Sequence, residues 1–377
     1  QFAMLYPIAN NFQLGFESSE ADQIRLAAVG LSNFLAAPSP LIQCEELSSV
    51  IGQTVLLKLE HTLPSGSFKI RGAFNKISSV LKTADQDQKP QFVTSSAGNH
   101  VLACCHVWQQ LGVSGSAVFV PTTVAPAKEA KLTRLHQAGL IRLSKVGREC
   151  LETELAGREF ALRCPGSVYV PPYSDWEVIR GQGSAAFELF PDPTGTGWAG
   201  QLSANSDWLA AGHVTLLVPT GGGGLLAGVA LCAKLGRSGL RTTVIGCQPE
   251  ADQVLAKSVQ AGRLLSYDEA GSRETVAQGT AGAVEDGSPT FEVCRQHVDR
   301  WCSVTEQEIA RACLRLNKIL AAEGQPRAEP AAALGVAAAL KLAGSLPAGP
   351  VVAFVTGGNV GDAEMELVKK LADEEDL

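Results

Sequence analysis

The sequence of 377 residues has few charged side chains (18%), few aromatic side chains (6%) and only 2 methionines. No apolar run approaches the roughly 18 residues that a transmembrane helix needs, so we expect no membrane-spanning segment and no membrane partner. The net charge of −7 leaves no excess of basic groups, which argues against a nucleic-acid partner. A small-molecule partner is compatible with this charge, because a local pocket can differ in sign from the whole chain.

Paired cysteines and targeting signals are also missing. The 10 cysteines include no Cys-x-x-Cys pair, so no zinc motif supports a bound metal. Several cysteines, such as Cys104, Cys105 and Cys232, lie in apolar surroundings, which is typical of reduced and buried thiols. The N-terminal residues show no basic region followed by an apolar stretch, as a secretory signal would. These absences predict a cytoplasmic protein.

Apolar residues are abundant, at 45% of the chain with a mean hydropathy of +0.09, which excludes a disordered chain. Apolar runs of strand length alternate with segments of helical periodicity. This alternation predicts an α/β fold whose parallel sheets are covered by helices. The expected strands are residues 54–59, 91–94, 116–120, 214–218, 242–247 and 351–356, and the expected helices include residues 99–110, 126–137, 306–322 and 330–342.

The first stretch of chemical interest is Ser65–Ala73, which reads Ser-Gly-Ser-Phe-Lys-Ile-Arg-Gly-Ala. Lys69 stands among small residues at the expected start of a helix, where its side chain can face a cavity. A lysine amine that is shielded from water there has a lowered pKa and can form a Schiff base. On residue type alone, an exposed lysine in a first helical turn is the alternative.

A second stretch, Thr94–His100, joins an expected strand to an expected helix and reads Thr-Ser-Ser-Ala-Gly-Asn-His. Hydroxyl groups, an amide side chain and backbone N–H groups converge there, which suits the binding of a carboxylate at a helix N-terminus. An ordinary Ser or Asn helix cap would explain the same residues.

Two glycine-rich stretches follow other expected strands. The first contains four consecutive glycines, Gly221–Gly224, whose N–H groups can surround a phosphate at the start of a helix. The stretch matches neither Gly-x-Gly-x-x-Gly nor the P-loop pattern, so a dinucleotide or a nucleoside triphosphate is poorly supported, and a flexible turn is the alternative. In the second, Val355–Val360, Thr356 ends a strand, where its hydroxyl can hydrogen-bond a ring nitrogen.

A lysine, a carboxylate site, a phosphate loop and a hydroxyl for a ring nitrogen are together what pyridoxal phosphate and an amino acid require. In these motifs, and in Val178–Gly183 and Glu329–Ala333, the chain resembles the fold-type II pyridoxal-phosphate enzymes. It is most similar to the threonine/serine dehydratases (threonine ammonia-lyases), whose motifs occur here in the same order between Pro38 and Leu371.

The resemblance implies an α/β, tryptophan-synthase-β-like fold of two domains, with parallel or mixed sheets and flanking helices. The large pyridoxal-phosphate-binding domain would comprise residues 1–88 and 178–377, and the small inserted domain residues 89–177, with the asparagine loop. Substrate would bind between the domains. The resemblance further implies a homodimer, and we expect no C-terminal regulatory domain after Thr356.

Individual roles also follow from the resemblance. Lys69 would bind the cofactor as a Schiff base and remove the α-proton of the substrate. The cofactor phosphate would contact Gly221, Gly222, Gly223 and Gly224. Asn99 would contact the ring hydroxyl of the cofactor, Thr356 its ring nitrogen and Phe68 one face of its ring. Glu329 would lie near the cofactor. The substrate carboxylate would be bound by Ser96, Ala97 and His100.

The sequence departs from the family pattern at several places. Ala97 stands where related racemases have a serine, so two-base racemisation lacks one partner. Gln248 replaces an acid that often binds a cation in this family, which places a divalent metal in doubt. Pro191–Asp207 is an insertion that we expect to be a surface loop, with a cover over the site or an interface as alternatives. Val170–Trp176 either admits a bulky β-substituent or packs at a hinge.

We therefore predict an enzyme that dehydrates and deaminates a β-hydroxy amino acid (threonine, serine or a bulkier analogue) to a 2-oxo acid and ammonia. Pyridoxal 5'-phosphate would be its cofactor and the amino acid its partner. One alternative is another β-elimination or β-replacement, such as diaminopropionate lyase or O-acylserine sulfhydrylase-like activity. Another is a non-catalytic protein that binds an amino acid or the cofactor, although the complete set of Lys69 and four glycines weighs against it.

Overall fold

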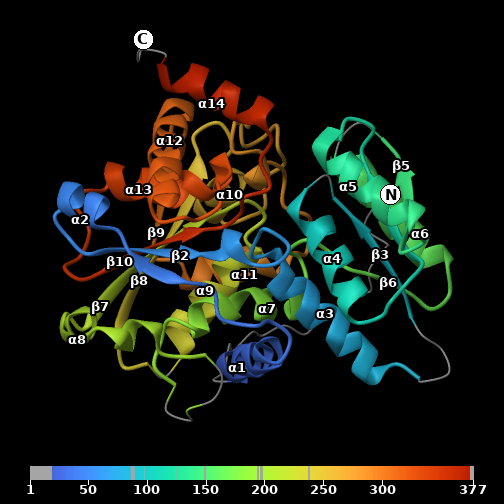
Figure 1. Ribbon diagram of the computed structural model, residues 1–377, viewed down its shortest axis with the longest axis horizontal. Coiled ribbons are helices and arrows are strands. Elements are labelled where there is room, and N and C mark those ends of the chain that lie inside the picture. Colours follow the sequence, from blue (N-terminus) through green and yellow to red (C-terminus); the bar gives the residue numbers. More distant parts are fainter. Residues whose placement is uncertain are drawn as a thin grey trace.

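Two sheets with helices on their faces make up the computed structural model, as the alternation of apolar patterns predicted (Figure 1). The structure describes residues 19–85, 90–96, 98–124, 126–147, 150–192, 195, 198–236 and 238–373. Within these residues, no helix has both the length and the apolar character needed to cross a membrane.

The larger sheet has 6 strands in the order β1-β2-β10-β7-β8-β9. Strand β1 pairs antiparallel with β2, and the other neighbouring pairs are parallel, so the sheet is mixed. The strands are β1 (Leu41–Gln43), β2 (Val55–Leu59), β7 (His213–Pro219), β8 (Arg241–Pro249), β9 (Arg300–Val304) and β10 (Val351–Val355).

Side chains of the central strands alternate between two hydrophobic cores, because successive residues of a strand point to opposite faces. Leu57 and Val355 belong to the core on one face, whereas Leu56 and Phe354 belong to the core on the other. Figure 1 shows α12 and α13 on one side of this sheet and α7, α9 and α1 on the other. The helices of this larger half are α1 (Ser19–Ser32), α2 (Glu45–Ile51), α7 (Trp176–Phe187), α8 (Ser206–Ala210), α9 (Gly224–Leu235), α10 (Val254–Ala261), α11 (Pro289–His297), α12 (Glu306–Ala322), α13 (Leu334–Lys341) and α14 (Asp362–Asp373).

The smaller sheet has 4 parallel strands in the order β5-β4-β3-β6. Its strands and helices are β3 (Gln91–Ser95), α4 (Asn99–Gln110), β4 (Ser116–Val120), α5 (Pro126–Gln137), β5 (Ile141–Lys145), α6 (Cys150–Arg163) and β6 (Ser167–Tyr169). All of them lie in the chain between β2 and β7. The smaller sheet is therefore an insertion between neighbouring parts of the larger half.

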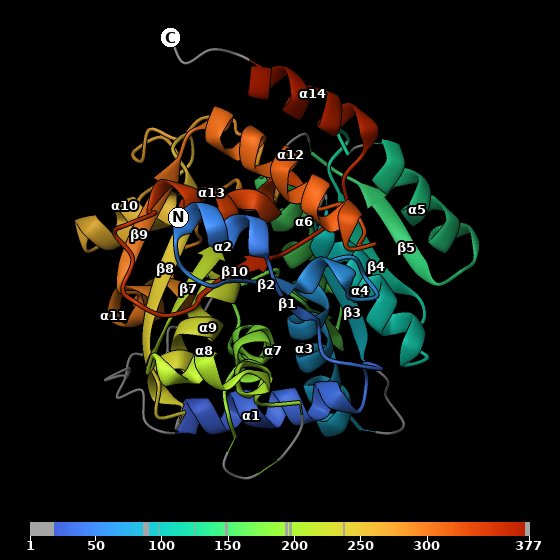
Figure 2. The same ribbon diagram turned by 60° about the vertical axis from the view of Figure 1, so that its left-hand side comes forward.

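Helix α3 (Lys69–Thr83) connects the two halves (Figure 2). It packs against α7 of the larger half and against α4 of the smaller half. Its buried Ile70, Ala73 and Ile77 share a core with Val101 and Val118 of the smaller half. Any displacement of one half relative to the other therefore acts on the helix that begins at Lys69.

The sequence predictions of strands 54–59, 91–94, 116–120, 214–218, 242–247 and 351–356 are confirmed to within two residues at each end. Strands β1, β5, β6 and β9 were not predicted; two of them have only 3 residues, and β5 mixes charged with apolar side chains. The helix expected over 330–342 begins instead as a 3-10 turn, Pro330–Ala333.

The prediction that Pro191–Asp207 is a plain surface loop is wrong for its second half. Residues Gln201–Ala204 form a 3-10 helix, and Leu202 is buried with 1% exposure. Gln201 also donates a hydrogen bond to the carbonyl of Ser39, at 2.8 Å. A buried leucine and this hydrogen bond attach the segment to the larger half.

Candidate active site

Lys69 is the first residue of α3, as the sequence predicted. Its amine Nζ donates a hydrogen bond to the carbonyl of Pro172, at 2.8 Å, and lies 5.1 Å from the centre of the Phe68 ring. Loss of hydration lowers the pKa of Lys69 to about 8, although the carboxylates of Glu329 and Glu154 act in the opposite direction. A larger share of this amine is therefore neutral, and nucleophilic, than in an exposed lysine.

The asparagine loop approaches Lys69 from the smaller half. Asn99 is the first residue of α4, and its Nδ2 donates to Oε1 of Glu329, at 2.7 Å. Asn359 donates to Oδ1 of Asn99, at 2.9 Å. Ser96 accepts a hydrogen bond from Gly98 N, at 3.1 Å, so its hydroxyl stays within the loop that precedes the helix. Ala97 lies outside the described residues.

His100 contacts the segment around Val170 and Pro172, and the carbonyl of Pro172 accepts the hydrogen bond of Lys69. Nε2 of His100 lies 2.9 Å from the carbonyl of Val170, two residues before Pro172. Burial is the main cause that lowers the pKa of His100 to about 3, so the ring is neutral at physiological pH. Because a carbonyl only accepts, Nε2 carries the proton and donates it. The side chain of His100 thus holds the backbone at Val170. The backbone N–H group of His100 is not used in this contact.

Thr356, Gly357 and Glu329 lie at the end of β10 beside the residues that precede Lys69. The N–H group of Phe68 donates a hydrogen bond to the carbonyl of Thr356, at 3.1 Å. Ser67 forms an isolated antiparallel β-bridge with Gly357. A Cβ atom at Gly357 would collide with the carboxylate of Glu329. The absence of a side chain at position 357 therefore lets Glu329, which is 8% exposed, reach Asn99.

The four glycines form a tight turn between β7 and α9. Gly223 has a φ of 86°, a conformation that other residues rarely adopt. A Cβ atom at Gly222 would lie 2.6 Å from the ring of Tyr173, and one at Gly221 would lie 2.7 Å from the carbonyl oxygen of Thr280. No side chain fits here, so this turn offers only backbone groups at the N-terminus of α9. The first N–H groups of a helix have no partner within it and attract anions.

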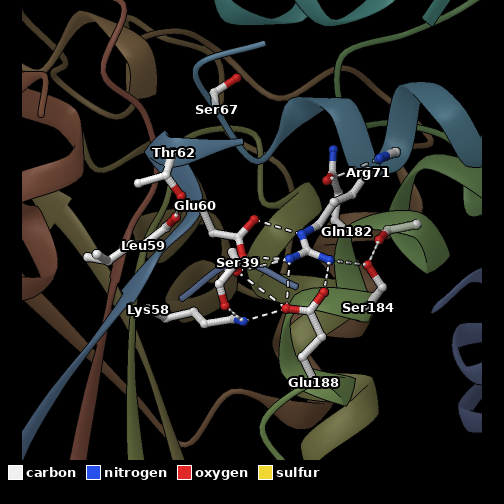
Figure 3. Close-up of polar contacts among 12 residues, drawn as sticks. Ser39, Lys58, Leu59, Glu60, Thr62, Ser67, Arg71, Gln182, Ser184 and Glu188 are labelled. Carbon is white, nitrogen blue, oxygen red and sulfur yellow. Dashed lines mark hydrogen bonds and ion pairs between the residues drawn. The ribbon is translucent and has the colours of Figure 1, made fainter. Parts of the chain in front are cut away.

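A buried network of four charged residues, Lys58, Glu60, Arg71 and Glu188, lies next to the start of α3 (Figure 3). Arg71 donates to both carboxylate oxygens of Glu60, at 2.7 and 2.9 Å, and to both of Glu188, at 2.7 and 3.0 Å. Lys58 forms an ion pair with Glu188. Burial lowers the pKa of Arg71, but the two carboxylates outweigh it and raise the pKa overall. The network fixes Arg71, two residues after Lys69, to Glu60 directly after β2 and to Glu188 directly after α7.

Close helix packing adds to this constraint. A Cβ atom at Gly181 in α7 would lie 2.6 Å from the carbonyl oxygen of Arg71 and 2.7 Å from Cα of Gly72. The backbones of α7 and α3 therefore approach closely in the turn that carries Lys69. The stretch Val178–Gly183, which the sequence comparison singled out, has this packing role in the structure.

Comparisons with known proteins match this geometry. The family model described as pyridoxal-phosphate dependent enzyme matches residues 33–357. The L-threonine ammonia-lyase of Thermotoga maritima is 32% identical over 83% of this chain and 69% of that protein. The L-threo-3-hydroxyaspartate ammonia-lyase of Saccharomyces cerevisiae is 31% identical over 85% of this chain and 88% of that protein. Among solved structures, the processed threonine deaminase isoform 2 of Solanum lycopersicum has a TM-score of 0.75 at 26% identity, and covers 94% of this chain and 89% of that one.

The chain belongs to the pyridoxal-phosphate dependent enzymes. The resemblance to threonine dehydratases and the fold-type II architecture expected from the sequence are both confirmed. Pyridoxal phosphate is accordingly the cofactor.

The residues of this pyridoxal-phosphate enzyme fit its cofactor on physical grounds. The turn at Gly221–Gly224 has no room for side chains and presents a helix N-terminus, which suits a phosphate. Lys69 offers an amine of lowered pKa, which suits an aldehyde. Gln248, by contrast, donates to the carbonyl of Thr220, at 3.2 Å, and accepts from Ala256 N, at 3.0 Å, so it supports the strand end before the glycines.

Sequence reasoning assigned no role to Tyr173 individually, or to Glu154, Arg158 and Glu285. The hydroxyl of Tyr173 donates to the carbonyl of Ala283, at 3.3 Å, so the segment Val170–Trp176 joins the glycine turn to a loop of the larger half. The aromatic character of the segment was the only signal for it. The three charged residues carry no sequence motif, and tertiary structure alone brings them together.

Proposed function

We propose that this enzyme converts a β-hydroxy amino acid, such as threonine or serine, to a 2-oxo acid and ammonia. The observation that carries the proposal is the partly buried amine of Lys69, which is hydrogen-bonded to the carbonyl of Pro172 and has a pKa lowered by desolvation to about 8, in a chain of this family. The named activities of the related L-threonine and L-threo-3-hydroxyaspartate ammonia-lyases support the same reaction class. Water leaves the β-carbon and is used again when the released enamine hydrolyses, so threonine yields 2-oxobutanoate and ammonia.

Lys69 has two roles in this proposal. Bound pyridoxal phosphate supplies a carbonyl for Schiff-base formation and withdraws electrons from the substrate α-carbon. Lys69 holds the cofactor and, once its amine is free, accepts the α-proton. Its lowered pKa leaves much more of the free amine unprotonated near neutral pH than in a lysine of ordinary pKa, and the unprotonated amine is the form that a general base requires.

Other residues bind and orient. We assign the phosphate to Gly221–Gly224 at the N-terminus of α9, and the substrate carboxylate to Ser96, Ala97 and His100, of which His100 lies in the first turn of α4. The geometry of α4 supports the second assignment, because its 12 residues give the helix a full dipole. We also assign Asn99 and Glu329, which are hydrogen-bonded to each other, to contacts with the cofactor ring, and Phe68 to one face of that ring.

Thr356 gives the ring nitrogen a neutral partner. A threonine hydroxyl, unlike an aspartate, does not stabilise a protonated ring nitrogen, which favours elimination over transamination. Thr356 is 5% exposed, so water competes little for its hydroxyl. Replacement by aspartate should therefore increase the share of half-transamination, and an unchanged partition would contradict this role.

We further propose that residues 89–177 form the small domain and residues 1–88 and 178–377 the large one, with substrate bound between them. Closure of the domains would exclude water from the reacting groups. We also propose a homodimer, which rests on the family resemblance and which sedimentation equilibrium would measure. A reducing compartment such as the cytoplasm is supported by the cysteines of the described residues, of which nine are free and eight of these buried.

The deciding experiment measures 2-oxobutanoate from L-threonine, with wild type and Lys69→Ala compared at equal cofactor occupancy. We expect turnover by the wild type and a loss of about 1,000-fold or more in the variant. Borohydride reduction followed by peptide mass spectrometry should label Lys69. Turnover that requires a thiol or amine acceptor would indicate β-replacement, and bound cofactor without any turnover would indicate a binding protein.

A further inference from the structure

Three charged residues form an ion cluster between the two halves of the molecule, which we call the Arg158 cluster. Arg158 and Glu154 lie on α6 of the smaller half, and Glu285 lies in the segment before α11 of the larger half. Nη2 of Arg158 is 2.7 Å from Oε1 of Glu154 and 2.5 Å from Oε2 of Glu285. The side chains of Arg158, Glu154 and Glu285 are 15%, 19% and 26% exposed. The cluster is therefore shielded but still in reach of solvent.

The Arg158 cluster adjoins the candidate active site through Tyr173. The N–H group of Glu285 donates to the hydroxyl of Tyr173, at 3.3 Å, and the ring of that tyrosine covers Gly222. The residue before it, Pro172, accepts the hydrogen bond of Lys69. The cluster thus shares one short segment with the amine and the glycine turn.

A second contact leads to the asparagine loop. Gly157 of α6, adjacent to Arg158, packs against Ser95, and a Cβ atom there would overlap the hydroxyl of that serine. Ser95 precedes Ser96, to which we assign the substrate carboxylate. Glu154 also acts directly on the site, because its carboxylate raises the pKa of Lys69 against the effect of burial. The Arg158 cluster is therefore close enough to influence charge at the reacting centre.

Taken by themselves, the three residues of the Arg158 cluster do not balance in charge. Two carboxylates share one guanidinium, which leaves one negative charge. Arg158 also lies over the ring of Tyr169, 4.7 Å from its centre, so the aromatic face occupies a further side of the guanidinium. A substrate carboxylate that extends toward this cluster would have to displace a glutamate from Arg158 or approach two glutamates of like charge. Either course costs free energy that a neutral side chain avoids.

We propose that Glu154, Arg158 and Glu285 restrict this enzyme to β-hydroxy amino acids without a negative charge beyond the β-carbon. Serine, threonine and neutral analogues belong to this class, whereas 3-hydroxyaspartate does not. The inference rests on the proposed deaminase function and narrows its substrate class.

The first test compares kcat/KM of the wild-type holoenzyme for L-threonine, L-serine and L-threo-3-hydroxyaspartate. We expect at least one neutral substrate to exceed the acidic one by about tenfold or more, as the repulsion of like charges several ångströms apart predicts. Equal or better turnover of 3-hydroxyaspartate would overturn the inference and leave the deaminase function intact. The absence of turnover with every substrate would instead contradict the deaminase function.

The second test removes one charge at a time and also measures binding. Glu285→Gln and Glu154→Gln should each lower the preference for the neutral substrate by about threefold to tenfold. Isothermal titration of L-aspartate and L-2-aminobutyrate, which lack the β-hydroxyl, should show the same change in relative affinity without any turnover. Glu366→Gln on α14, where the glutamate is 62% exposed and paired with Lys369, removes the same charge elsewhere and should leave the preference unchanged.

Thermal unfolding and cofactor absorbance distinguish this electrostatic effect from a loss of structure. A preference that stays constant in both correctly folded variants would overturn the inference. If Glu154→Gln unfolds because Arg158 loses a partner, Glu285→Gln alone decides the result.

Discussion

Two arginines near Lys69 each bind two glutamates, but they differ in burial and in charge balance. The side chains of Arg71 and its partners Glu60 and Glu188 are at most 3% exposed, and Lys58 completes two cations against two anions. Arg158 and its partners are between 15% and 26% exposed, with one cation against two anions. The same side-chain chemistry therefore gives a sealed, neutral network in one place and a partly hydrated, negative cluster in the other.

This difference assigns two roles: one region stabilises the turn that carries Lys69, and the other selects the substrate. Buried and balanced charges interact strongly with one another and present little net charge to a ligand, so the network of Lys58, Glu60, Arg71 and Glu188 fixes the turn that carries Lys69. Charges that are partly hydrated and unbalanced contribute little to the free energy of unfolding, but they create an electrostatic field that acts on a nearby ligand. We expect mutations in the two regions to affect different measurements.

The largest effect should come from Arg71→Met, which leaves Glu60 and Glu188 buried without their shared cation. Removal of one partner from a buried ion network typically costs about 3–5 kcal/mol of unfolding free energy. Urea unfolding followed by circular dichroism measures this loss. Arg71→Lys keeps the charge and loses the paired hydrogen bonds, so its stability should fall between the wild type and Arg71→Met.

A matched control is Arg315→Met, which breaks an ion pair of 2.8 Å with Glu46 at the surface, where the side chains are 31% and 47% exposed. Its cost should stay within about 1 kcal/mol. Equal losses in Arg71→Met and Arg315→Met would show that the buried network does not hold the turn.

The residues of the candidate site could be predicted from the sequence better than the residues of the two charged regions could. Lys69, the glycines and Thr356 each follow a strand or begin a helix within a short motif, so local pattern was enough to place them on the predicted elements. Arg71 was visible only as part of the lysine motif, and its partner Glu188 lies beyond the end of α7 with no motif of its own. Arg158 and Glu285 meet because α6 and the segment before α11 come together in space. Neither periodicity nor spacing records such a contact.

An intermediate effect should appear in the pKa of Lys69. In cofactor-free protein, competitive acetylation at several pH values, followed by mass spectrometry, should give a midpoint of about 8. Because Glu154 raises the pKa of Lys69, Glu154→Gln should lower this midpoint further. The change should be less than about one unit, because the side chain of Glu154 is partly exposed and solvent screens its charge. Glu366→Gln should leave it unchanged. A midpoint near the ordinary lysine value of 10.5 would contradict the shielding of this amine.

The same shift fixes the sign of a pH effect on stability. The folded-state pKa of Lys69 lies below its unfolded value, so between about pH 8 and 10.5 the unfolded chain binds the extra proton. The contribution of Lys69 to unfolding free energy therefore rises with pH across this window and is constant below it. Lys69→Met should remove this component in cofactor-free protein, which a difference between the two pH–stability curves would reveal.

The smallest effect should be the response to salt, and it tests the contrast between the two regions directly. Salt screens charges in contact with solvent much more than buried charges, since the screening length falls from about 10 Å at 0.1 M to about 3 Å at 1 M. The preference for threonine over 3-hydroxyaspartate should therefore fall by about twofold to threefold between 0.05 and 0.5 M sodium chloride. The stability difference between wild type and Arg71→Met should stay nearly constant over the same range, because the charges of this network are almost completely buried. If salt changed the stability difference and left the preference unaltered, the roles assigned to the two arginines would have to be exchanged.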